Sequence, residues 1–211
     1  MNVNRRESLG LLLGTACSAV AAEPWKVDVT QEAMAPWGKT PDHLEPAEIQ
    51  VPQFYYLAQF VSFPSFTEGQ YLALVKGKEK GQYELRAAKA GGQGMKEAPK
   101  KTHAILVPED LARTTYELWT NMLFETRYPK AAYHGLDGTT YVFSTFVRAL
   151  GWMHGSVWTP NEDQPPGWIT QIAGELHQFA TQGSMNVAEI TKRVMSTRDR
   201  YFAHLKKHGR H

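Results

Sequence analysis

The sequence contains one cysteine, Cys17, among its 211 residues. Cys17 lies within the first 22 residues, which have the features of a cleaved export signal. A chain shortened after Ala22 has no thiol, which excludes disulfides, cysteine nucleophiles and cysteine metal ligands from the mature protein. We therefore expect the hydrophobic core alone to stabilise the fold in an oxidising compartment.

An excess of either charge is also lacking, with 23 basic residues against 21 acidic ones. Removal of residues 1–22 takes away two basic residues and one acidic residue, which leaves a net charge of about +1. Nucleic-acid binding is dominated by contacts between Lys or Arg and phosphates. A nearly neutral chain is therefore not expected to bind nucleic acid.

Motifs of known catalytic chemistry are lacking too. The chain has neither a His-Glu-x-x-His zinc motif nor a Gly-x-Ser-x-Gly nucleophile turn. The run "GGQG" at 91–94 is followed by no helix start whose amides would cradle a phosphate. The sequence thus assigns no cofactor, and whether the protein is an enzyme stays open.

The first 22 residues have the three parts of an export signal. Arg5 and Arg6 form a charged head, the 14 residues from Leu9 to Ala22 are uncharged, and small residues ("SAVAA") end the segment. A helix needs roughly 20 apolar residues to span a bilayer. We therefore expect a cleaved signal, no transmembrane anchor, and a periplasmic or secreted protein.

The arginine pair followed by Leu9 and a glycine-diluted apolar run resembles a twin-arginine export signal. The resemblance implies that the chain crosses the membrane already folded. Asn4, Ser8 and Gly10 depart from the usual pattern, so general secretion stays as an alternative. Lipidation at Cys17 is a third route, although the leucine usual three residues before such a cysteine is replaced by Gly14.

Residues 23–52 are predicted to form a proline-rich extended arm, because proline fixes φ and removes a backbone donor. The arm either wraps the domain, with Trp25 and Trp37 as anchors, or is a loose leader. It holds five of the twelve prolines: Pro24, Pro36, Pro41, Pro46 and Pro52.

Residues 53–211 are predicted to form one α+β domain, an antiparallel sheet packed against about three helices. Alternating patterns predict strands over 53–63, 102–108 and 151–158, and a hairpin from 70–77 and 82–89. Asp137-Gly138 predicts a second hairpin, of 131–136 with 139–146, across a type I′ turn.

Helices are predicted after Pro108, over a stripe from Trp168 to Phe179, and after Asn186. Gly183 lies beyond the end of the second helix. Asn186 with Glu189 three residues later indicates a capping box for the third.

Polar and aromatic side chains are densest between residues 127 and 177. Glu175 and His177 in this region flank Leu176 on an amphipathic helix and are interpreted as a solvated helix edge. The candidate ligand-binding residues are Arg127, Tyr133, His134, Asp137, Tyr141, His154 and Trp158.

Most of the candidates also have a purely structural interpretation: Asp137 as a turn residue, the two histidines as strand residues, Tyr133 and Tyr141 as sheet packing, and Trp158 as a core residue. A metal hypothesis combines His134, Asp137 and His154, which would suit zinc or iron. No fixed spacing supports it, so the sequence assigns no metal.

The run "ETRYPKAAYHGLDGTTYVFSTF" followed by "VWTP" is similar to a pattern in small uncharacterised envelope proteins of bacteria. The resemblance covers about a quarter of the chain and implies no activity.

Three hypotheses of function follow. The first is a non-catalytic exported protein whose Trp and Tyr side chains bind an envelope small molecule, a glycan or a protein partner. The second is a small periplasmic hydrolase or metal-dependent enzyme that uses the His134, Asp137 and His154 region. The third is an assembly factor that binds its partner through residues 23–50. The sequence gives neither the ligand nor the oligomeric state.

Overall fold

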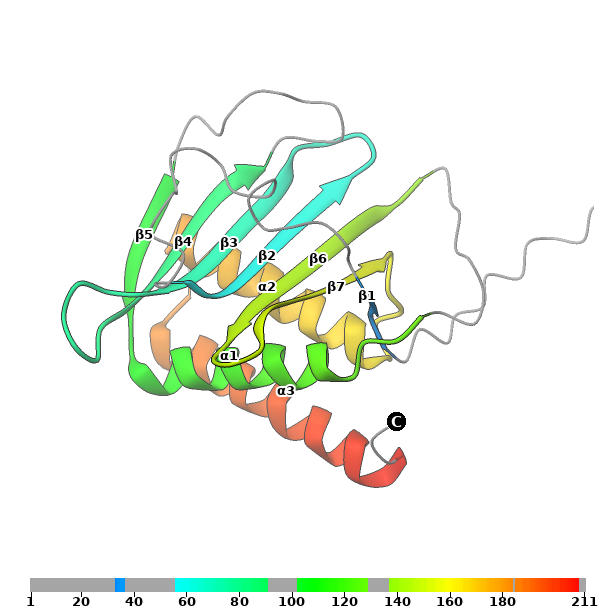
Figure 1. Cartoon of the computed structure of the whole chain (residues 1–211). Coiled ribbons are helices and arrows are strands. Elements are labelled where there is room, and N and C mark those ends of the chain that lie inside the picture. Colours follow the sequence, from blue (N-terminus) through cyan, green and yellow to red (C-terminus); the bar gives the residue numbers. More distant parts are fainter. Residues whose placement is uncertain (1–32, 37–55, 91–101, 129–136, 184, 209–211) are drawn as a thin grey trace, which may run out of the picture.

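The computed structural model describes residues 33–36, 56–90, 102–128, 137–183 and 185–208. These residues form one seven-stranded sheet and three helices, and every strand pair is antiparallel (Figure 1). The predicted α+β class is confirmed. The strands lie in the order β1-β7-β6-β2-β3-β4-β5. The elements are β1 (Ala35–Pro36), β2 (Tyr56–Pro64), β3 (Gly69–Lys76), β4 (Tyr83–Ala90), β5 (Thr102–Val107), α1 (Glu109–Phe124), β6 (Thr139–Val147), β7 (Gly151–Trp158), α2 (Pro165–Gln182) and α3 (Val187–His208).

The helices pack in two layers on one face of the sheet. Helix α1 contacts β2, β6 and β7, while α2 contacts β3, β4 and β5. Helix α3 contacts α1 and α2 and forms the outer layer, farthest from the sheet (Figure 1). The main core joins strand residues such as Phe60, Leu72 and Phe143 to helix residues such as Trp119 and Leu176.

The other face, which we call the second face, carries its own buried cluster. Tyr71, Val75 and Val142 belong to it, and among the described residues its members come from strands alone. Strand β2 contributes to both clusters, with Phe60 in the main core and Val61 on the second face. Both faces of β2 are therefore buried, and the strand predicted over 53–63 is confirmed for residues 56–63.

The helix ends follow the chemistry of their residues. Helix α2 has proline in its first turn, where no backbone donor is needed, and ends at Gly183 with a φ of 61°. The Asn186 side chain accepts a hydrogen bond from the Ala188 amide (2.8 Å), so this part of the predicted capping box is confirmed. Glu189 instead bonds Arg193 (2.9 Å), which stands one helical turn later.

The hairpin predicted at Asp137-Gly138 is wrong. Strand β6 pairs with β2 on one edge and with β7 on the other, which leaves no edge for residues 131–136. Gly138 does not have the positive φ that a type I′ turn requires there. The hairpin partner of β6 is β7, and Ala149 and Gly151 adopt positive φ in the connection.

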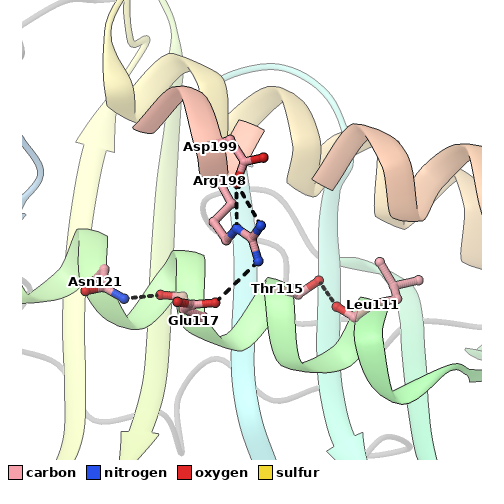
Figure 2. Close-up of polar contacts among 6 residues, drawn as sticks. All are labelled: Leu111, Thr115, Glu117, Asn121, Arg198 and Asp199. Carbon is pink, nitrogen blue, oxygen red and sulfur yellow. Dashed lines mark hydrogen bonds and ion pairs between the residues drawn. The ribbon is translucent and has the colours of Figure 1, made fainter. Parts of the chain in front are cut away.

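Helix α3 is fixed to α1 by apolar packing and by polar contacts at their interface. The guanidinium of Arg198 lies 3.7 Å from the Glu117 carboxylate on α1 and also bonds the neighbouring Asp199 (Figure 2). Arg198 is therefore an arginine whose charge is balanced within the fold.

In the described ranges, no helix is both long and apolar enough to cross a membrane. Most of the predicted arm, residues 23–52, lies outside the described residues. Of the part that is described, Ala35 and Pro36 form the edge strand β1 against Ser156 and Gly155.

Candidate functional site

His154 lies on β7, and its side chain is on the second face of the sheet. It pairs across the strands with Ser144 of β6, which in turn pairs with Gln59 of β2, so the three form one polar row. Nδ1 of His154 is 2.9 Å from the Ser144 hydroxyl, which fixes the orientation of the ring. Burial lowers the pKa of His154, so the imidazole is neutral at neutral pH.

Trp152 continues this face two residues before His154. The two rings are almost parallel, with centroids 6.1 Å apart and an angle of 13° between them. Phe146 of β6 and Tyr56 of β2 support the indole, with ring centroids 5.7 and 6.4 Å away. The indole is thereby held in position while remaining half-buried.

Trp158 stands at the far end of β7 and packs on the start of β6. A Cβ atom added to Gly138 would lie 2.5 Å from the Trp158 ring, so only glycine allows this approach. Two bonds close the strand ends: the Thr159 amide to the Thr139 carbonyl (2.9 Å) and the Thr139 amide to the Thr159 hydroxyl (3.1 Å). Trp158 is thus positioned by rigid backbone.

Trp152, His154 and Trp158 share one face of β7, because side chains alternate between faces along a strand. We call these three residues the aromatic strip. All three are half-buried, and the strip extends about 20 Å along the strand at roughly 3.3 Å per residue. The two other tryptophans of the described ranges, Trp119 and Trp168, are buried.

Tyr141, Arg127 and Asp137 are the other predicted site residues that the structure describes, and none of them belongs to this strip. Tyr141 faces the helices, where its ring stacks on Phe60 at 6.1 Å, so the packing interpretation holds for it. The Arg127 amide bonds the Met34 carbonyl (2.9 Å) after the end of α1. Asp137 is exposed and adjoins Gly138, which places it near the Trp158 end of the strip.

Tyr133 and His134 lie outside the described residues, so the proposed triplet with Asp137 and His154 is described only in part. In the portions of the chain that the structure describes, no three His, Cys, Asp or Glu side chains are grouped as metal ligands.

His177 is buried against the sheet, whereas the sequence indicated a solvated helix edge. Its Nε2 lies 3.0 Å from the Ala88 carbonyl, which makes Nε2 the protonated nitrogen. Burial lowers the pKa of His177; the bond to Ala88 opposes this shift, and the charge of His103 adds to it. The folded state therefore favours neutral His177.

We expect this histidine to make the protein less stable in mild acid. The unfolded chain binds a proton near the ordinary pKa of 6.5, whereas the folded chain resists protonation. The free energy of unfolding should decline as the pH falls below about 6.5, and less steeply in a His177→Gln variant. Urea unfolding of both chains over this window measures the difference, and equal slopes would contradict the assignment.

No family model matches this chain, and none of the curated proteins or solved structures compared with it is similar.

Sequence reasoning missed Ser144 and Trp152 as members of the site. The alternation "WMHGSVW" does place Trp152 on the same strand face as His154 and Trp158. Ser144 is assigned only by the register between β6 and β7, which the sequence does not reveal. Sequence reasoning also missed a cleft between α2 and α3, described below.

Proposed function

We propose that this chain is an exported, non-catalytic binding protein of the bacterial envelope, and that its ligand lies along the aromatic strip. The observation that carries the proposal is the position of Trp152, His154 and Trp158 on one strand face. Flat aromatic rings offer a large apolar contact at low entropic cost. An array about 20 Å long suits an extended ligand, such as a glycan strand.

The neutral state of the His154 imidazole suits the binding of an uncharged ligand such as a glycan. Its Nδ1 is engaged by Ser144, and a neutral imidazole leaves Nε2 as a polar atom for a ligand hydroxyl. A rigid sheet holds both rings and the polar atom in place, so little freedom is lost on binding. Export is proposed from Arg5, Arg6 and the uncharged run after them.

The Ser144–His154 bond is the observation that favours the hydrolase alternative, because a neutral imidazole beside a hydroxyl can accept its proton. Ser144 is 0% exposed, however, and a nucleophile must reach its substrate. The hydroxyl is therefore better assigned to orienting the imidazole. The assembly hypothesis rests on the arm, most of which lies outside the described residues.

Binding to purified peptidoglycan sacculi tests the proposal by co-sedimentation. The Trp158→Ala variant is expected to bind about tenfold more weakly than the wild type, the size of loss typical of an aromatic hot spot. Tyr128→Ala is the matched control, because Tyr128 is an aromatic side chain with 83% exposure outside the strip. It should bind as the wild type does.

Two results would contradict the proposal. One is a wild-type chain that does not sediment with sacculi, which would exclude this glycan as the ligand. The other is equal sedimentation of Trp158→Ala and the wild type, which would exclude the strip. Circular dichroism of each variant confirms that the fold is retained.

A further inference from the structure

A polar cleft of about 290 Å³ lies between α2 and α3, on the helical side of the molecule and away from the strip. Four residues of α2 from Trp168 to Glu175 line it, and so do four of α3 from Arg193 to Arg200. Each set follows the spacing i, i+3, i+4, i+7, so each forms one stripe on its helix. The cleft is therefore built by two facing stripes.

Arg200 is fixed at one end of the cleft by stacking. Its guanidinium carbon is 3.9 Å from the centroid of the Trp168 ring. The indole is 7% exposed and is held from another side by His204, edge-on at 5.6 Å. A stacked guanidinium keeps its N–H donors in the plane of the group, where they can bind a planar or tetrahedral oxyanion.

The charge of Arg200 is not balanced by a carboxylate of the described residues. Arg198, two residues earlier, bonds Asp199 and approaches Glu117 (Figure 2). Arg193, at the other end of the cleft, bonds Glu175 (3.2 Å) and Glu189 (2.9 Å). Glu175, the carboxylate among the residues that line the cleft, is thus directed to Arg193 through its Oε1 atom, and Arg200 has donors to offer.

Two hydroxyl groups line the middle of the cleft, between the arginines. Four described threonines in helices donate their hydroxyls to the carbonyl four residues earlier: Thr115, Thr170, Thr181 and Thr191. Ser196 and Thr197 make no such bond in the described structure. Their small side chains create the hollow, and their hydroxyls are available as donors.

We propose that this cleft binds the carboxylate or phosphate group of a small soluble molecule. Arg200 is the main ligand of the oxyanion, and Ser196 and Thr197 donate further hydrogen bonds to it. The volume is at the lower end of the range for small-molecule sites, which fits a metabolite and not a polymer. The proposal is independent of the function assigned to the strip.

Titration of the full chain with sodium phosphate and with sodium acetate, at constant ionic strength, tests this site. The readout is the indole N–H resonance of Trp168, identified by its loss in Trp168→Phe. We expect a saturable shift with at least one of the two anions. Arg200→Gln should weaken binding by about tenfold or more, because charged hydrogen bonds are the strong ones. Lys206→Gln, which removes an exposed cation of the same helix outside the cleft, should stay within about twofold.

The pattern of response identifies the ligand class. A shift with phosphate alone indicates a phosphate monoester, and a shift with acetate alone indicates a carboxylate. No saturable shift with either anion, or an equal affinity in Arg200→Gln, would overturn the proposal. If Arg200→Gln does not fold, Thr197→Val decides, because it keeps the side-chain shape and removes one donor. An unchanged affinity in that variant would overturn the site.

Discussion

Replacing Trp119 with alanine is expected to lower the free energy of unfolding by about 3–5 kcal/mol. Trp119 is 0% exposed and lies at the centre of the contact between α1 and the sheet. Its ring meets Phe143 edge-on at 5.7 Å, and Phe143 in turn packs on Phe60 at 5.0 Å. Truncation leaves a cavity that rigid strands cannot fill.

Chemical denaturation measures this effect, with Phe124→Ala as the control on the same helix. Phe124 is 53% exposed, so its truncation should change stability by about 0.5 kcal/mol or less. A loss below about 1 kcal/mol for Trp119→Ala would show that α1 does not pack on the sheet in this way.

Gly167→Ala is expected to destabilise the protein by about 1–3 kcal/mol, because overpacking forces the backbone to move. A Cβ atom at this position would lie 2.1 Å from the Asn161 carbonyl oxygen and 2.9 Å from the Glu162 Cα. Both are backbone atoms, so no side-chain rotation relieves the clash. Gly167 precedes Trp168, and the displacement should also disturb the cleft between α2 and α3.

Gly174 in the same helix provides the matched control, because its replacement with alanine is expected to raise stability instead of lowering it. No atom lies within 4 Å of a Cβ built there, so alanine is accommodated. Gly174→Ala should stabilise the protein by about 1 kcal/mol through its higher helix propensity. Thermal unfolding of the two variants tests the pair, and equal melting temperatures would contradict the described start of α2.

Local signals predicted the fold well where neighbours in sequence are neighbours in space. The alternation around "GKEKG" gave the hairpin of β3 and β4, in which Leu74 opposes Leu85. Helix α2 and its end at Gly183 followed from an apolar stripe and a glycine. Both depend on contacts within a short stretch of chain.

The pairing of β6 could not be predicted because it is set by distant residues. Asp137-Gly138 is a strong turn signal by itself. The partner of β6 is set instead by residues far away in the sequence, since Gln59 of β2 pairs with Ser144 of β6. The pairing of β6 with β2, which is buried between β6 and β3, outweighs the local preference of Asp137-Gly138 for a hairpin turn. Gly138 instead accepts a bond from the Ser65 amide (3.0 Å) and makes room for Trp158.

The candidate site was predicted in part for the same reason. His154 and Trp158 share a face because they stand four residues apart on one strand, where side chains alternate between faces. Tyr141 was grouped with them by closeness in sequence, yet its register opposite Val157 turns it toward the helices. The cleft between α2 and α3 depends on Trp168 and Arg200 from two helices, and no pattern within one helix indicates their contact.

Native mass spectrometry of the chain isolated from the envelope fraction of its host tests the central claim most directly. We expect the wild type to lack residues 1–22 and to carry an additional mass that disappears under denaturing conditions. The Trp158→Ala variant should carry this mass at clearly lower occupancy. A chain that keeps residues 1–22, or equal occupancy in both proteins, would contradict an exported protein that binds its ligand on the aromatic strip.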